Sequence, residues 1–393
     1  MHENLILLGA GATSAISDDC LPTAGNFFTS NAEWSDHKND FPHLALAYKK
    51  VEHLKNESSD NRPVNLTDVW LFIDTLYKYH VAMATIDRNN KNYNSGLLRL
   101  RYKEYGEALP YYLSPGYLNN HYNELCFDMH PLFSTLDKQI YSTFTSSDPV
   151  NYFLILAGWE LKYLNYKTYG IDKKTNGLYK KLIGELKSKN ASVISFNWDI
   201  YFEKACKAEG RSIQLVLNGN DKHDNNIIYL CKPHGGWNIQ HVDNLVLPYP
   251  TLSDSIEDRL FDRVEAGEVR PAMIPYFSGP DEISALHGFV FPHVGEFFKA
   301  QQEVMKKMFN AAKNMVSIGY SFSEDDRHVL DLITPLAGRN KKRLLCILKD
   351  KDEKNKERIG KTWNYDSVDN FQYDGSGFRG ESIKSIVSFL NGE

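Results

Sequence analysis

The chain has 393 residues, of which 42% are hydrophobic and 24% are charged, as in an ordinary globular protein. Its 45 basic and 50 acidic residues give a formal net charge of -5, which excludes a general attraction to nucleic acid or acidic membranes. We therefore expect no direct nucleic-acid binding. No run approaches the roughly 18 consecutive apolar residues of a membrane helix, and no basic leader follows Met1, so we expect a cytoplasmic protein.

The cysteines argue against a zinc module. They are five in number, and no two have the C-x-x-C spacing of a zinc knuckle, so we expect no zinc and no metal site. An odd number of scattered thiols also argues against a disulfide framework. We expect most of them to be buried hydrophobic residues. They are Cys20, Cys126, Cys206, Cys231 and Cys346.

The first predicted element is a buried strand, Asn4–Leu8, which ends at Gly9-Ala10-Gly11. Small and hydroxylated residues, including Thr13 and Ser14, then open a predicted helix, as at the start of a Rossmann domain. Glycines let the backbone approach a phosphate, the helix N-terminus offers free N–H groups, and a hydroxyl could add a donor. A simple strand-to-helix corner is the alternative interpretation of the same turn.

The dinucleotide fingerprint G-x-G-x-x-G is incomplete in this turn. Ser14 occupies the place of its third glycine, and Glu33, an acidic residue about 20 positions on, follows no second predicted strand. The sequence therefore does not favour a dehydrogenase.

Residues 31–189 are predicted to form a large, mostly helical insertion. Its segments Thr67–Tyr79, Val150–Tyr166 and Thr175–Leu186 space their apolar residues as amphipathic helices do. Many aromatic residues fall between Phe41 and Tyr169. We interpret them as helix packing; stacking on nucleic-acid bases is the alternative, but few basic residues lie among the rings.

Apolar strand-like runs return after residue 190, with helical stretches such as Gly295–Lys313 between some of them. This alternation predicts an α/β fold, a Rossmann-like parallel sheet with helices on both faces. Residues 1–30 and 190–393 would form that domain, and the charged run Lys349–Lys361 would be a solvated surface. The predicted strands are Ser192–Phe196, Asn226–Leu230, Met273–Tyr276, Met315–Gly319 and Arg343–Lys349.

Two polar side chains, Asn197 and Asp199, directly follow the second predicted strand. The carboxyl ends of parallel strands are where such sheets bind ligands. The Asn197 amide could bond a ribose hydroxyl or orient a water, and the Asp199 carboxylate could accept from a carboxamide. Capping of the next helix by Asp199 is the alternative.

A histidine, His234, follows the third predicted strand and precedes two glycines. The glycines predict a flexible loop that leaves the imidazole free to face a ligand and to titrate near neutral pH. A structural or merely exposed histidine is the alternative.

The fourth motif, Gly319-Tyr320-Ser321, ends another predicted strand, and an acidic cluster that includes Asp326 follows it. Gly319 would allow close approach of a ligand, Ser321 could bond a phosphate or ribose, and Asp326 could hold ribose hydroxyls. An acidic helix N-terminus that binds nothing is the alternative.

Taken in order, the four motifs resemble those of the sirtuin (silent information regulator) family, and most closely its bacterial antiphage-defence branch. The family shows a Gly-Ala-Gly-x-Ser turn, an Asn-x-Asp, a His-Gly and a Gly-x-Ser, which here read Gly9–Thr13, Asn197–Asp199, His234–Gly235 and Gly319–Ser321. The segment Pro22–Phe28 is similar to the family loop that lays a phenylalanine, here Phe27, near nicotinamide. The resemblance covers about residues 1–28 and 190–330.

The resemblance implies a NAD glycohydrolase that cleaves NAD, as its substrate, to nicotinamide and linear or cyclic ADP-ribose. It implies catalysis by Asn197, Asp199 and His234, phosphates bound at Gly9–Ser14, and adenosine ribose near Gly319–Ser321. It also implies antiphage defence by NAD depletion, a homo-oligomer, and a second defence protein such as a DNA-translocating ATPase or an Argonaute-like protein. Thr13 replaces the family's serine, and the four-cysteine zinc module of the protein deacylases is absent.

Two other functions stay open from the sequence. One is a non-catalytic module that senses NAD or ADP-ribose. The other is NAD-dependent protein deacylation, against which the missing cysteine module weighs.

Overall fold

A computed structural model describes most of the chain in two compact units. One unit comprises residues 1–23, 169–280 and 291–393, and the other comprises residues 24–168 and 281–290. The predicted limits of the helical block are residues 31 and 189. The described residues are 2–17, 21–76, 111–114, 117–118, 120–121, 149–170, 175–186, 190–216, 227–242, 245–248, 270–273, 292–323, 326–337, 342–349, 354–363 and 371–392.

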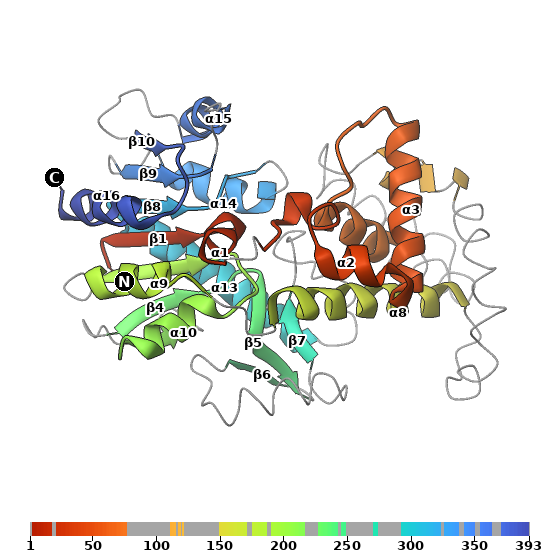
Figure 1. Ribbon diagram of the computed structural model, residues 1–393, viewed down its shortest axis with the longest axis horizontal. Coiled ribbons are helices and arrows are strands. Elements are labelled where there is room, and N and C mark those ends of the chain that lie inside the picture. Colours follow the sequence, from red (N-terminus) through yellow and green to blue (C-terminus); the bar gives the residue numbers. More distant parts are fainter. Residues whose placement is uncertain are drawn as a thin grey trace. The chain divides into compact units, whose positions relative to one another are not determined.

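The first unit is built on a seven-stranded sheet with all neighbouring strands parallel (Figure 1), so the predicted α/β fold is confirmed. The central strand β1 pairs with β2 on one side and with β8 on the other. In spatial order the strands are β10 (Phe371–Asp374), β9 (Arg343–Ile347), β8 (Asn314–Ile318), β1 (Asn4–Leu8), β2 (Ala191–Ser195), β4 (Ile227–Cys231) and β3 (Ser212–Leu215).

Helices cover both faces of this sheet because its strands are apolar on both sides. Leu5 and Leu7 of β1 belong to one buried cluster with residues of α13 (Pro292–Ala311), α14 (Arg327–Ala337) and α15 (Lys354–Trp363). The other face carries α9 (Leu178–Glu185), α10 (Tyr201–Ala208) and α16 (Gly380–Asn391), which lie in front of the strands in Figure 1.

A second, three-stranded sheet corrects one prediction. The strands β5 (Gly235–Val242), β6 (Leu245–Pro248) and β7 (Arg270–Met273) pair antiparallel in the order β6-β5-β7. The run Met273–Tyr276 was expected in the parallel sheet, but Met273 ends β7, and residues 274–276 lie outside the described residues. A short apolar run predicts a strand without telling which sheet it joins.

The remaining predicted strands correspond to β1, β2, β4, β8 and β9 with ends that differ by one or two residues at most. The edge strands β3 and β10 were not predicted. Both are four residues long and partly exposed, so they lack the continuous apolar run of the central strands. In the charged run Lys349–Lys361, residues 354–361 are helical and belong to α15.

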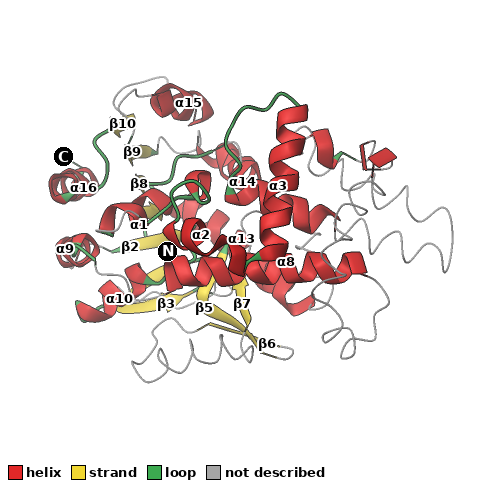
Figure 2. Ribbon diagram, turned by 45° about the vertical axis from the view of Figure 1, so that its right-hand side comes forward, coloured by secondary structure: helices red, strands yellow, loops and turns green. Residues whose placement is uncertain are grey.

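The second unit is helical in its described part (Figure 2) and contains α2 (Ala32–His37), α3 (Pro42–Glu57) and α8 (Pro149–Asn165). Helices α3 and α8 pack together, and Glu160 of α8 accepts the backbone N–H of Leu44 at 2.7 Å and contacts His43 Nδ1 at 2.5 Å. Residues 66–76, part of the predicted helix Thr67–Tyr79, are helical as well. Among the helices of the described ranges, none combines the length and apolarity needed to cross a bilayer.

Candidate functional site

The four motifs follow four strands that are neighbours in the sheet, namely β8, β1, β2 and β4. Along the chain, β1 and β2 are followed by the edge strand β3 and then by β4, which lies between β2 and β3, and the chain later returns to β8 on the other side of β1. Such a reversal of strand order opens a crevice at the carboxyl edge of a parallel sheet, where these folds bind ligands. Motifs separated by up to about 300 residues along the sequence therefore meet at one edge.

The glycines of the first and fourth motifs pack backbone against backbone. Gly9 N donates to Ile318 O at 3.0 Å, and Gly11 N donates to Gly319 O at 3.1 Å. A Cβ added to Gly319 would lie 2.0 Å from Ala12 N, and one added to Gly9 would lie 2.5 Å from Gly319 O. These contacts alone require glycine. They also occupy the Gly11 N–H, one of the N–H groups at the start of α1 that were expected to be free for a phosphate.

Thr13 of α1 (Ala10–Ile16) joins the first motif to the second. The Asn197 Nδ2 group donates to Gly9 O and to Thr13 Oγ1, both at 2.9 Å. The Thr13 hydroxyl in turn donates to Asp199 Oδ2 at 2.6 Å. All three side chains are at least 90% buried, so these bonds are shielded from water.

These contacts decide which atoms of the second motif remain for a ligand. Both Nδ2 hydrogens of Asn197 are used inside the protein, which leaves its Oδ1 as the amide atom that could accept a bond. Asp199 Oδ1 accepts the N–H of Tyr201, the first residue of α10, at 3.1 Å, although the N-cap residue of that helix is Ile200 and not Asp199. Burial raises the pKa of Asp199, while the Thr13 bond and the charge of Lys232 oppose that shift.

His234 lies against the second motif. Its carbonyl accepts from Trp198 Nε1 at 3.1 Å, and its ring meets the Phe196 ring edge-on with centroids 5.3 Å apart. Two expectations for this residue are wrong. Gly235 and Gly236 begin β5 instead of a flexible loop, and burial lowers the pKa of His234 to about 4, against the opposing effect of a hydrogen bond to the Phe196 backbone.

The fourth motif is held from α15. Arg358 donates through Nη2 to Ser321 O at 2.5 Å and through Nη1 to Phe322 O. Phe322 is buried with φ of 52°, a conformation that costs a bulky residue free energy and that its surroundings must enforce. Asp326 N donates to Ser323 O at 3.0 Å.

The other predicted contact residues differ in position. Ala10 and Ser14 are partly exposed on α1, and Ser321 is partly exposed after β8. Phe27 lies in the second unit, fully buried against Phe28, and its contact with nicotinamide stays a prediction. The neighbouring acids at positions 324 and 325 lie outside the described residues.

Three buried polar residues beside the motifs were missed from the sequence. Lys232 forms an ion pair with Glu203 of α10, with Nζ 2.9 Å from Oε1. Tyr179 in the first turn of α9 lies close enough to Thr13 and Asn197 for its hydroxyl to interact with both side chains, but it forms no hydrogen bond of normal geometry within the described part of the chain. A lysine at the end of an apolar strand was a usable signal for the ion pair, whereas nothing in the sequence marks Tyr179.

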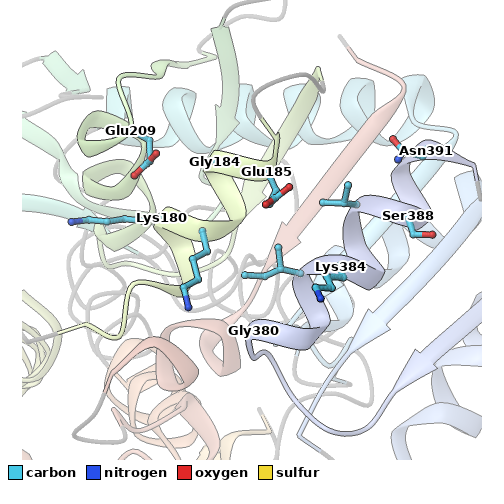
Figure 3. A pocket seen from close by; sticks show the side chains of 11 residues that line it. Lys180, Gly184, Glu185, Glu209, Gly380, Lys384, Ser388 and Asn391 are labelled. Atoms are coloured by element: carbon cyan, nitrogen blue, oxygen red, sulfur yellow. The ribbon is translucent and has the colours of Figure 1, made fainter.

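A cavity of about 660 Å³ lies elsewhere, between α9 and α16 (Figure 3). Lys384 and Ser388 of α16 and Glu185 of α9 line it. None of the predicted site residues is in its lining, so it is distinct from the strand-end motifs.

The described residues contain no group of three or more His, Cys, Asp or Glu side chains placed to hold a metal ion. Their three cysteines, Cys206, Cys231 and Cys346, are buried, and burial raises the pKa of each thiol. Comparison with protein-family models gave no matching family, and comparison with curated proteins gave no matching sequence.

Proposed function

We propose that this protein is a NAD glycohydrolase that cleaves NAD to nicotinamide and ADP-ribose at the edge formed by its strand-end motifs. One observation carries the proposal: the four motifs that resemble those of sirtuins follow four adjacent parallel strands around the reversal point of the sheet. A dinucleotide is long enough to contact several such loops at once.

Each part of NAD would be bound by a different group of residues. The N-terminus of α1 and Ser14 would face the phosphates, and Ser321 and Asp326 the adenosine ribose. Asn197 Oδ1 would accept from a hydroxyl of the nicotinamide ribose. Asp199 would accept from the carboxamide through a lone pair that its bonds to Thr13 and Tyr201 leave unused.

Cleavage of the bond between nicotinamide and ribose develops oxocarbenium character, as in glycoside hydrolysis. Nicotinamide leaves as a neutral molecule, so no strong general acid is needed. His234, with its pKa lowered to about 4, is neutral at pH 7 and can accept the proton of the attacking water. A neutral, weak base suits this step because water needs little activation toward such an electrophile.

The test measures nicotinamide release from NAD by wild type, Asn197→Ala and His234→Ala. We expect release by wild type and a loss of ~10²–10⁴-fold in kcat for His234→Ala. Full activity in both variants would contradict the assignment of the site. Zinc content should be measured on the same samples, because one zinc per chain would favour the deacylase.

A second function, binding of NAD or ADP-ribose without cleavage, has one observation in its favour. The Asn197 amide nitrogen and both Asp199 oxygens already have partners within the protein. Saturable NAD binding with no nicotinamide release, in the presence and absence of candidate activators, would favour this sensor. The antiphage role, self-assembly and a second defence protein depend on the sirtuin resemblance alone; expression during phage challenge, with NAD levels followed, tests the first.

A further inference from the structure

Lys232 is the most deeply buried charge beside the strand-end motifs. Its side chain is 0% exposed and that of its partner Glu203 is 5% exposed. Lys232 lies two residues before His234, and Glu203 lies four residues after Asp199. The ion pair therefore connects the loop after β4 to the helix that follows the loop after β2.

The Lys232 ammonium group also donates a hydrogen bond to the backbone. Lys232 Nζ donates to Asp199 O at 2.8 Å, and the backbone N–H of Lys232 donates to Gln301 Oε1 of α13 at 2.9 Å. A Cβ added to Gly236 would lie 2.6 Å from Nζ, so the chain beyond His234 folds tightly over the lysine side chain. The ammonium group thus joins the segment after β4 both to α10, through Glu203, and to the backbone of the loop after β2, through Asp199 O.

Two more bonds join the same loops. Trp198 Nε1 donates to His234 O at 3.1 Å, and Trp237 N donates to Trp198 O at 2.9 Å. The hydrogen bonds of Lys232, Trp198 and Trp237 thus connect the Asn197–Asp199 loop to His234 and to the residues on either side of it.

Stability alone gives a weak reason for a buried ion pair here. Removing two charges from water costs several kcal/mol per ion, and well-packed apolar residues often replace such a pair with no loss of stability. A charged pair does fix direction, because it works only in one arrangement of donor and acceptor atoms. Fixed direction is what a reacting centre built from two separate loops requires.

We propose that Lys232, through its pair with Glu203, is a positioning residue that holds the loops of Asn197 and His234 in the one arrangement in which both face the same substrate. The inference rests on the proposed function for its kinetic consequence, but its structural consequence can be measured without catalysis.

The experiment compares Lys232→Met and Glu203→Gln with the control Lys342→Met. Lys342 is also buried, but its ammonium group donates to Phe309 O and Ala312 O at the end of α13. Each protein is assayed for kcat and KM of nicotinamide release. Each is also labelled with ¹³C at histidine Cε1 and titrated by NMR, with the His234 signal identified by its loss in His234→Gln.

We expect Lys232→Met to lower kcat by ~10²-fold with little change in KM, because misplaced groups slow the chemical step more than they weaken binding. The pKa of His234 should rise from about 4 toward 6.5, because burial is what lowers it and water gains access to the imidazole when the loops loosen. Glu203→Gln should move both quantities in the same direction by less. Lys342→Met should lower the melting temperature and change neither.

The outcomes separate the two proposals. If wild type releases no nicotinamide, the proposed function fails, and the His234 titration alone decides whether Lys232 positions the loops. If a folded Lys232→Met protein keeps the wild-type kcat and His234 pKa, the positioning inference is wrong. The same holds if Lys342→Met produces equal changes. Should Lys232→Met not fold, Glu203→Gln decides by the same two measurements.

Discussion

Each compact unit buries a lysine against a carboxylate, but the two pairs connect the chain in different ways. In the helical unit, Lys55 Nζ lies 2.8 Å from Asp68 Oδ2 and 3.3 Å from Asp60 Oδ2, all within a segment of 14 residues that joins the end of α3 to the next helix. In the sheet unit, Lys232 bonds groups that lie 29, 33 and 69 residues away in sequence.

The difference teaches that a buried charge by itself does not mark a functional site. The Lys55 pair closes a local turn, and the Asp68 carboxylate that it contacts also accepts the Asn65 N–H at 3.0 Å. The Lys232 pair instead lies among the loops of a titratable histidine and a buried aspartate. We therefore infer the role of a buried ion pair from the segments that it connects, and not from its burial.

The largest expected effect tests whether the Lys55 pair is purely structural. Lys55→Met leaves Asp68 buried without its cation and should lower the free energy of unfolding by about 3–5 kcal/mol. Nicotinamide release, measured below the melting temperature, should not change. The exposed pair of Arg62 with Asp60 is the control, and Arg62→Ala should cost at most about 1 kcal/mol. A Lys55→Met protein with a tenfold lower kcat would break the comparison.

The next prediction concerns the close backbone packing at Gly319 in the strand-end motifs, which Gly177 at the start of α9 does not have. Gly319→Ala combines a φ of 65° with a Cβ 2.0 Å from Ala12 N, so we expect a loss of about 2–5 kcal/mol in urea unfolding. Gly177 has a φ of 75° and open space around it, which makes Gly177→Ala a matched control. It should cost only the ~1–2 kcal/mol of the left-handed backbone. Equal losses in both variants would show that the close packing of the motifs is not what requires Gly319.

Burial of His234 gives the sheet unit a pH dependence of stability. Its pKa is about 4 in the folded chain and ordinarily 6.5, so between these pH values the unfolded chain binds the extra proton. The free energy of unfolding should thus be unaffected above pH 6.5, fall by up to about 3 kcal/mol as the pH drops toward 4, and level off below.

Urea unfolding of wild type and His234→Gln between pH 4 and 7.5 isolates this contribution as the difference between the two proteins. Other titrating groups, such as the buried His2 with its lowered pKa, contribute equally to both. Parallel curves for the two proteins would mean that His234 is as accessible as the sequence suggested.

The sequence predicted the parts of the molecule that depend on local pattern. The apolar run of β1 with its glycine turn, and the strands before Asn197, His234 and Gly319, are all read from short segments. Because each motif follows a parallel strand, their meeting at one edge of the sheet also follows from the sequence.

The features that could not be predicted from the sequence depend on packing between segments that are far apart along the chain. The low pKa of His234 comes from burial that Phe196 and Trp198, more than 30 residues away, help to create. The antiparallel pairing of β7 depends on β5, which no periodicity within Met273–Tyr276 encodes. Tyr179 belongs to a segment that was assigned to the helical block, so nothing linked it to the motifs.

The smallest expected effect concerns two tyrosines near Asp199. The Tyr169 hydroxyl donates to Pro22 O at 2.7 Å, whereas the buried Tyr179 hydroxyl lies near Thr13 and Asn197 but forms no hydrogen bond of normal geometry with any described residue. Tyr169→Phe should therefore cost about 1 kcal/mol of unfolding free energy, and Tyr179→Phe should be neutral or slightly stabilising.

A buried hydroxyl without a partner calls for an explanation, and a bond made only when substrate is bound would supply one. In that case Tyr179→Phe lowers nicotinamide release at unchanged stability, and Tyr169→Phe shows the reverse; a Tyr179→Phe protein that loses as much stability as Tyr169→Phe would show that its hydroxyl is already bonded in the free protein.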